Sequence, residues 1–287
     1  MPEPDVSVIV PVRDGAATLP ALLESVRRQT LAPERFEVVV VDNASRDASA
    51  EVAARAGAQV VTEPVPNRAR ARNRGVAAAR ARLYAFTDAD CVVDPGWLEA
   101  LLGCAPRAPL VAGPVEIRTR ERPNAVERFE ALWRFGQESW VRQGWAATAN
   151  LAVAAEAFAA VGGFDPAWRH VAEDVDLCVR AARGGFELGW CPEARVEHLA
   201  ERALRPMLAR LFIHGYSSNQ AVHRLGMGYR AWRDPWPALA GRRALRIVAG
   251  PTDGLSAAEL RRMARLARLG YGARVLGSLW AELTRAR

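Results

Sequence analysis

The first hundred residues alternate short apolar runs with helical patterns, and this alternation limits the fold more than any other feature of the sequence. Short runs rich in Val, Ile and Phe are typical of strands buried on both faces. Between the first two runs, Leu19, Leu22, Leu23 and Val26 repeat at helical spacing. The predicted strands cover residues 6–12, 36–41, 59–62 and 83–87, and an arginine-rich helix is predicted over 67–82. The pattern predicts an α/β fold with a mostly parallel sheet and crossover helices.

Three of these predicted strands end in acidic or turn-forming residues. Arg13 and Asp14 follow the first strand, Asp42 follows the second, and Asp88 and Asp90 follow the fourth. In open α/β sheets, ligands bind outside the carboxyl ends of parallel strands. The sequence therefore predicts a ligand site at that edge of the sheet.

The pair Asp88 and Asp90 forms a D-x-D motif within FTDADC. Residues two apart in an extended chain share a face, so both carboxylates can approach one divalent cation. The longer pattern DADCVV also fits haloacid-dehalogenase-like phosphatases, in which the first aspartate is a nucleophile. Those enzymes usually carry the motif on the first strand and use a lysine. Here the strand is the fourth, and the chain has no lysine.

The second half predicts a further acidic helix and a basic tail. After Gly163, the pattern predicts a loop, a helix over 174–183 and two strands, with His198 at the end of the second strand. Beyond residue 200 the pattern is helical, and Ser256 to Glu259 forms a capping box. The following residues predict an apolar face of Leu260, Met263, Ala264, Ala267 and Tyr271, opposite Arg261, Arg262, Arg265 and Arg268.

Charge is divided unevenly along the chain. Residues 1–199 hold 23 Arg against 27 acidic residues, whereas residues 200–287 hold 16 Arg against 5. The basic tail could pack with its arginines outward, or lie on an anionic membrane surface. Nucleic-acid binding is not expected, because no nucleic-acid motif accompanies these arginines.

The four cysteines and the absence of targeting signals suggest a location. Cys91, Cys104, Cys178 and Cys191 form no C-x-x-C pair, and we expect buried free thiols in a reducing compartment. The longest stretches without charge have 13 residues, too few to span a bilayer. The amino terminus lacks the pattern of a secretion signal. These features predict a cytoplasmic protein, with peripheral attachment to the inner membrane face left open.

Five motifs occur in an order that is typical of one family. They are VSVIVPVRDGAATLPALLESVRRQT, FEVVVVDNASRD, RARNRGVAAARARLYAFTDADC, GGFD and EDVDLCVRAARGGFELGWCPEARVEH. In these motifs the sequence resembles the family 2 glycosyltransferases, which have the GT-A fold, over about residues 5–199. The resemblance implies a GT-A domain over residues 1–225 and a basic helical extension over 226–287. Asn43 departs from the family, which often has a second aspartate there.

The resemblance also implies a role for individual residues. Asp174 resembles the catalytic base, with Glu173 beside it. The residues implied to bind the nucleotide-sugar donor are Pro11, Arg13, Asp14, Asp42, Arg72, Asn73 and Asp88. The residues implied to bind a divalent cation, Mn²⁺ or Mg²⁺, are Asp88, Asp90 and His198. Trp168, six residues before Asp174, could stack on an acceptor sugar or pack in the core.

The implied activity is that of a metal-dependent, inverting glycosyltransferase of the hexosyltransferase type. A cation would neutralise the diphosphate that leaves, and a single carboxylate base implies direct displacement with inversion. The chain has no Q-x-x-R-W motif, so we expect a non-processive enzyme. A non-catalytic module that binds sugar nucleotides or glycans remains an alternative. The donor's base and sugar and the acceptor, whether a glycan, a lipid-linked sugar or a small molecule, are not specified by the sequence.

Overall fold

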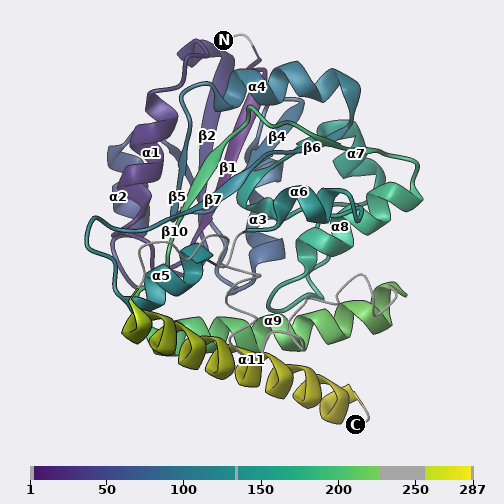
Figure 1. Ribbon diagram of the computed structural model, residues 1–287. Helices are drawn as coiled ribbons and strands as arrows, with labels where there is room; N and C mark the ends of the chain where they lie inside the picture. Colours follow the sequence, from purple (N-terminus) through teal and green to yellow (C-terminus); the bar gives the residue numbers. More distant parts are fainter. Residues whose placement is uncertain (1–2, 133–134, 227–255, 286–287) are drawn as a thin grey trace. The chain divides into compact units, whose positions relative to one another are not determined.

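A computed structural model describes residues 3–132, 135–226 and 256–285 (Figure 1). The chain divides into two compact units. Unit 1 comprises residues 1–116 and 136–198, and unit 2 comprises residues 117–135 and 199–287. The predicted boundary after residue 225 separates a catalytic domain from an extension, and it stays a prediction.

The main sheet of unit 1 has seven strands in the order β3-β2-β1-β4-β8-β6-β9. All neighbouring pairs are parallel except those that β8 makes with β4 and β6. The strands are β1 (Val6–Val12), β2 (Phe36–Asp42), β3 (Gln59–Thr62), β4 (Leu83–Phe86), β6 (Leu110–Ala112), β8 (Leu151–Ala154) and β9 (Leu188–Trp190). The chain builds the sheet outward from β1 in one direction and then returns to β4 on its other side. The predicted ligand site therefore lies at the switch point of the sheet.

The helices of unit 1 cover this sheet. They are α1 (Leu19–Arg27), α2 (Ser49–Arg55), α3 (Arg68–Ala78), α4 (Trp97–Cys104), α6 (Gln137–Val141), α7 (Ala155–Ala160) and α8 (Glu173–Arg183), with one-turn 3-10 helices at Pro33–Arg35, Ala105–Arg107 and Thr148–Asn150. Helix α3 lies close to the sheet because it carries Gly75, where a Cβ would come within 2.5 Å of the Ile9 side chain. This close packing fixes the side chains of α3 relative to the ends of β1 and β4.

Helix α3 is shorter than the predicted span of 67–82. Asn67 caps it, since the side-chain oxygen accepts a hydrogen bond from the Arg70 backbone at 3.0 Å. The helix ends at Ala78 because the next backbone N–H groups bond to strand side chains: Arg80 N–H donates to Glu37 Oε1 at 2.6 Å, and Ala81 N–H donates to Ser7 Oγ at 3.1 Å.

A small second sheet in the order β5-β10-β7 brings the predicted metal ligands together. Its strands are β5 (Cys91–Val93), β7 (Val115–Arg118) and β10 (Val196–Leu199). Strands β5 and β10 are antiparallel, and His198 pairs with Cys91. A residue near the end of unit 1 is thereby placed beside the D-x-D motif.

Unit 2 contains α5 (Ala125–Leu132), α9 (Leu204–Leu225) and α11 (Ala257–Arg285). Helices α9 and α11 run side by side (Figure 1). Their common core with α5 consists of Val126, Phe129, Met207, Leu211 and Leu266. The predicted capping box is confirmed, because Ser256 Oγ accepts from Glu259 N–H at 3.3 Å while Glu259 Oε2 accepts from Ser256 N–H at 2.9 Å. Among the described helices, none combines the length and the apolar character needed to cross a bilayer.

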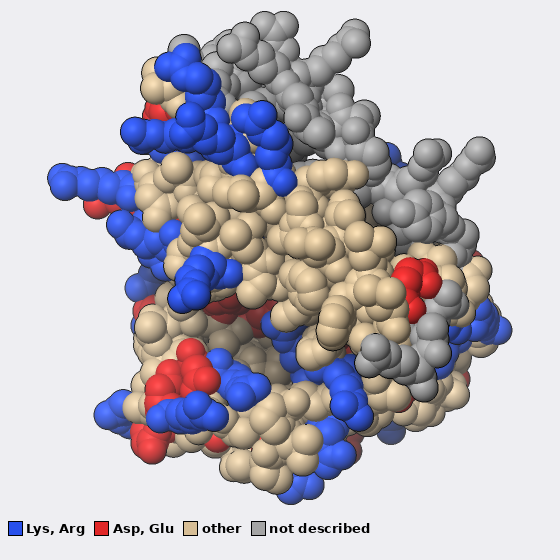
Figure 2. Space-filling model, turned by 90° about the horizontal axis from the view of Figure 1, so that it is seen from below, with Lys and Arg blue, Asp and Glu red and all other residues tan. Residues whose placement is uncertain are grey.

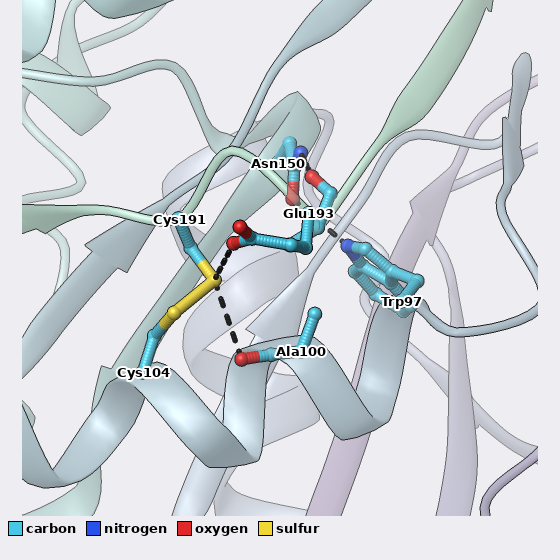
Figure 3. The surroundings of a disulfide bond; sticks show 7 residues. Trp97, Ala100, Cys104, Asn150, Cys191 and Glu193 are labelled. Atoms are coloured by element: carbon cyan, nitrogen blue, oxygen red, sulfur yellow. Dashed lines mark hydrogen bonds between the residues drawn. A yellow bond between two sulfur atoms is a disulfide. The ribbon is translucent and has the colours of Figure 1, made fainter.

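The expectation of four free thiols is wrong for two cysteines. Cys104, at the end of α4, and Cys191, directly after β9, form a disulfide (Figure 3). The pairing of β9 with β6 brings Cys191 to α4. The backbone nitrogen of Cys191 lies 2.9 Å from the carbonyl oxygen of Ala112, and the Cys191 sulfur lies 3.3 Å from the carbonyl oxygen of Ala100 in α4. Cys91 and Cys178 are free and buried, as expected.

Candidate active site

The D-x-D motif occupies the turn between β4 and β5. The carbonyl oxygen of Asp88 accepts a hydrogen bond from Cys91 N–H at 3.0 Å, which closes the turn. Asp90 Oδ1 lies 3.4 Å from His198 Nε2. One potential ligand atom from each of Asp90, Cys91 and His198 lies within 4.8 Å of the others. Two of the three predicted metal ligands are thus adjacent, and Asp88 stands two residues away in the same turn.

Within this set the Asp90 carboxylate and the His198 imidazole fit a divalent cation such as Mn²⁺, whereas the Cys91 thiol does not. Both Mn²⁺ and Mg²⁺ prefer carboxylate oxygens, and Mn²⁺ also accepts an imidazole nitrogen. Burial raises the pKa of Asp90, and the neighbouring charge of Asp88 adds to this rise, whereas His198 opposes it. The negative charge of Asp88, which adds to the effect of burial in raising the pKa of Asp90, favours a positive charge near this turn.

Arg72 in α3 joins the D-x-D turn to the start of α8. Its side chain is 3% exposed, with Nη1 at 2.5 Å from Glu173 Oε1 and Nη2 at 3.1 Å from Asp88 Oδ1. Burial acts to raise the pKa of Asp88, but the positive charges of Arg72 and Arg68 outweigh it and lower that pKa. The buried guanidinium therefore holds Asp88 as a carboxylate and fixes it relative to α8.

Asp174 lies in the first turn of α8, next to this bridge. Burial and then the negative charge of Glu173 raise the pKa of Asp174 to about 7, while Arg72 and the backbone N–H groups of Val175 and Thr148 oppose the rise. A carboxylate with this pKa exchanges its proton near neutral pH, which is the requirement for a general base. The helix starts sharply, because Ala172 before it has a left-handed backbone with φ 86°.

The predicted donor-binding residues Asp14 and Asp42 both bond to the loop that follows β2. Asp14 Oδ1 accepts from Arg46 N–H at 2.7 Å, and Asp42 Oδ1 accepts from Ser45 N–H at 3.2 Å. Arg13 is exposed and Pro11 lies within β1. Asn43, the departure from the family, is buried, and its amide donates to backbone carbonyls at 3.0 and 2.7 Å. Asn43 therefore shapes this loop.

Two predicted contact residues hold the chain that leads to α8. Asn73 donates to the carbonyl oxygen of Phe164 at 2.7 Å and accepts from its N–H at 2.9 Å. Trp168 is 2% exposed, and its carbonyl oxygen accepts from Asn67 at 3.3 Å. An acceptor sugar could stack on Trp168 only after this loop moved. Donor binding by Asn73 and acceptor binding by Trp168 stay predictions.

Sequence reasoning missed the buried ion pair of Arg72 with Glu173 and the contribution of Thr148. Arg72 and Glu173 are 101 residues apart, and Thr148 lies in a one-turn helix. No local pattern marks such partners. The one signal for these partners was the acidic cluster at the start of α8. The helix dipole accounts for one acidic residue there, so the other acidic residues need another role.

The arrangement defines the class of protein. A parallel sheet with its switch point between β1 and β4, an acidic turn after β4 and a carboxylate on a later helix are the features of a GT-A glycosyltransferase. Mannosyltransferase PcManGT from Pyrobaculum calidifontis, in complex with GDP-Man and Mn²⁺, matches with a TM-score of 0.68 at 18% identity, over 99% of this chain and 89% of that one. TarS 1-349 from S. aureus matches with a TM-score of 0.54 at 17% identity, over 98% and 91%. These structures confirm the fold.

Sequence comparisons identify the family. Residues 7–149 match the model of Glycosyl transferase family 2. The pre-mycofactocin glycosyltransferase of Mycobacterium tuberculosis is 35% identical over 228 residues, which cover 75% of this chain and 47% of that protein. Glycosyltransferase AglE of Haloferax volcanii is 30% identical over 194 residues, 64% of each chain. The chain belongs to glycosyl transferase family 2, as its motifs predicted, and it spans about half the length of the mycobacterial relative.

Proposed function

We propose that this chain is a metal-dependent, inverting, non-processive glycosyltransferase that moves a hexosyl group from a nucleotide-diphosphate donor to an acceptor hydroxyl. The observation that carries the proposal is the continuous contact from Asp88 through Arg72 to Glu173, which stands beside Asp174. It links Asp88 of the D-x-D turn to the start of α8, where the pKa of the Asp174 carboxylate suits proton removal.

The donor would occupy the carboxyl edge of the sheet. In this proposal the loops at Arg13, Asp14 and Asp42 contact the nucleotide, and Asp88, Asp90 and His198 hold the cation. A bound cation would supply positive charge that neutralises the diphosphate leaving group. The fold match to a mannosyltransferase in complex with GDP-Man and Mn²⁺ supports this choice of donor and metal.

The acceptor would approach Asp174 from the other side of the sugar. As the acceptor oxygen attacks the anomeric carbon, Asp174 takes its proton, and the bond to the diphosphate breaks on the opposite face. This single displacement inverts the anomeric centre. Glu173, which is 3% exposed and paired with Arg72, then positions the base and does not replace it.

The location remains part of the proposal. We place the enzyme in the cytoplasm, where nucleotide sugars would serve as donors. An oxidised Cys104–Cys191 pair in living cells would contradict this location, because disulfides are rare in a reducing compartment. Alkylation of free thiols in freshly lysed cells, followed by mass spectrometry, measures whether this pair is oxidised in its natural setting.

A thermal-shift panel tests the proposal. UDP-, GDP-, dTDP- and CMP-linked sugars are added with and without Mn²⁺ to the wild type, to Asp90→Ala and to the control Glu156→Gln, an exposed carboxylate at the opposite edge of the sheet. A ligand at 100 times its Kd stabilises by about 2.7 kcal/mol. We expect one nucleotide class to stabilise the wild type and the control only with metal, and Asp90→Ala to show no shift.

The other outcomes separate the alternatives. Metal-dependent stabilisation without any turnover would favour a binding module over an enzyme. Release of phosphate from simple phosphomonoesters would favour the phosphatase alternative. The absence of a shift with every donor would contradict the proposed donor site.

A further inference from the structure

The outer face of α11 exposes large apolar side chains. Leu269, Leu276, Leu279, Trp280 and Leu283 are 51%, 60%, 54%, 55% and 66% exposed. At 100° per residue these positions fall on one side of the helix. Figure 2, which views this side of the molecule, shows a broad uncharged area bordered by arginines. A contiguous apolar face of this kind marks an interaction surface.

The opposite face of α11, which packs on α9, carries polar pairs along the same stretch, beside small residues such as the buried Ala281. Glu282 Oε1 lies 2.8 Å from His223 Nε2 and accepts from Asn219 Nδ2 at 2.9 Å. Arg274 donates to Ser218 Oγ at 3.5 Å. Polar pairs between the helices, with leucines outside, differ from the arrangement of a helix pair whose outer face meets water.

Glycines bring the two helices together at this polar contact. A Cβ at Gly277 would overlap the carbonyl oxygen of Phe212, and one at Gly215 would overlap that of Arg274. Close helix contact through small and polar residues, with apolar side chains outward, is typical of helices in contact with lipid. The packing of α9 and α11 thus points to an apolar medium outside α11.

Charge indicates which apolar medium fits. Arg261, Arg262, Arg265 and Arg268 are exposed in the first half of α11. Arg265 precedes Leu269 and Leu276 by four and eleven residues, so it lies on the same face. Residues 200–287 hold 16 Arg against 5 acidic residues. A second copy would bring two strongly positive surfaces together, whereas an anionic lipid surface complements them.

We propose that the outer face of α11 docks onto an anionic lipid bilayer. The helix lies in the plane of the interface, with Leu276, Leu279 and Trp280 at the boundary between headgroups and acyl chains and the arginines over the headgroups. Tryptophan suits this position because its ring is apolar and its N–H is polar. This surface belongs to unit 2 alone, so the proposal does not depend on the chemistry of unit 1.

Vesicle co-sedimentation of the full chain tests the proposal. The vesicles are phosphatidylcholine alone, and phosphatidylcholine mixed equally with phosphatidylglycerol. We expect binding to the mixed vesicles that weakens as salt rises. Leu276→Ser/Trp280→Ser should bind them at least about tenfold more weakly, since two anchors are lost. The control Val65→Ser, which changes a 46% exposed side chain in unit 1, should bind as the wild type does.

Two double variants test whether the arginines of α11 contribute to the binding of anionic vesicles. Arg265→Gln/Arg268→Gln should lose most of the preference for the anionic vesicles. The control Arg27→Gln/Arg28→Gln, which removes the same charge from exposed positions at the end of α1 and directly after it, should keep this preference.

Two results would overturn the proposal. One is failure of the wild type to bind either vesicle. The other is a dimer, seen by light scattering, that Leu276→Ser/Trp280→Ser converts to a monomer while vesicle binding stays unchanged. The nucleotide-sugar thermal shift of this variant should equal that of the wild type, so failure of docking and failure of the proposed transferase function can be told apart.

Discussion

The carboxyl edge of the main sheet and the outer face of α11 both reverse the usual placement of side chains, in opposite ways. At the sheet edge, Arg72 and Glu173 are charged and buried. On α11, leucines and a tryptophan are apolar and exposed. Charged residues are almost never fully buried unless they are paired, and large apolar patches are rarely left open. Each region therefore carries a cost to stability that function explains better than folding does.

The two regions also differ in how the chain holds them. Unit 1 has a disulfide and a network of side-chain bonds across the sheet edge. The described helices of unit 2 meet through an apolar core at one end and through glycine contacts at the other. Substitutions at the sheet edge should therefore change the stability of unit 1, and substitutions in α11 should change the stability of unit 2.

The largest expected effect is that of reducing the disulfide. The two cysteines are 87 residues apart, and on the loop-entropy account their link contributes up to about 4–5 kcal/mol. Because both linked cysteines lie in unit 1, the loss should be largest in unit 1. Hydrogen exchange with and without reductant measures this, with Cys104→Ser/Cys191→Ser as the variant that reductant leaves unchanged. Equal hydrogen exchange in α4 with and without reductant would show that the disulfide does not stabilise unit 1.

The second-largest expected effect is that of removing the buried guanidinium of Arg72. Arg72→Met leaves Glu173 buried without its partner and should cost about 3–5 kcal/mol of unfolding free energy. Arg70→Met, which removes a partly exposed arginine from the same helix, should cost far less. Urea unfolding measures both. The double variant Arg72→Met/Glu173→Gln should recover part of the loss, and no recovery would argue against the ion pair as its cause.

A smaller effect tests the helix contact in unit 2. Gly277→Val places a side chain against the α9 backbone and should destabilise by about 1–3 kcal/mol. Gly272→Ala, in the same helix but with nothing within 4 Å of the added carbon, should be neutral or stabilising by up to about 1 kcal/mol. The thermal midpoint of unit 2 reports both changes. Equal effects would mean that α9 and α11 are not packed through Gly277.

The smallest effect is a pH dependence at the sheet edge. The pKa of Asp174 is raised to about 7, so below that pH the side chain is protonated and cannot accept the acceptor's proton. The value of kcat/KM should therefore rise about tenfold per pH unit below pH 7 and level off above it. A pH–rate profile with saturating metal measures this. A rate that is flat between pH 5.5 and 7, about the range where the shift acts, would remove Asp174 from the role of base.

Much of unit 1 could be predicted because parallel strands are buried on both faces. Residues 6–12 were predicted at the bounds of β1, which is buried along nearly its whole length. Residues 59–62 match the bounds of β3 as well, although this edge strand is partly exposed. The pairing of His198 with the D-x-D turn was also anticipated, through the family's order of motifs. Local apolar pattern and motif order are both written in neighbouring residues, which is why they can be read from one sequence.

The remaining features depend on contacts between distant parts of the chain. The antiparallel insertion of β8 and the Cys104–Cys191 link follow from how strands pair. The Arg72–Glu173 pair joins residues that no spacing relates. Asn73 was expected near the nucleotide, and only the folded chain shows that its amide bonds the backbone of Phe164. Side-chain direction in a packed site is set by such partners.

The most direct test of the account is the turnover of Asp174→Asn. With the donor class found by thermal shift, kcat/KM is measured for the wild type, Asp174→Asn and the control Glu156→Gln, together with donor affinity. The account predicts a loss of about 10²- to 10⁴-fold for Asp174→Asn, with donor affinity unchanged and the control active. Wild-type turnover by Asp174→Asn would contradict it.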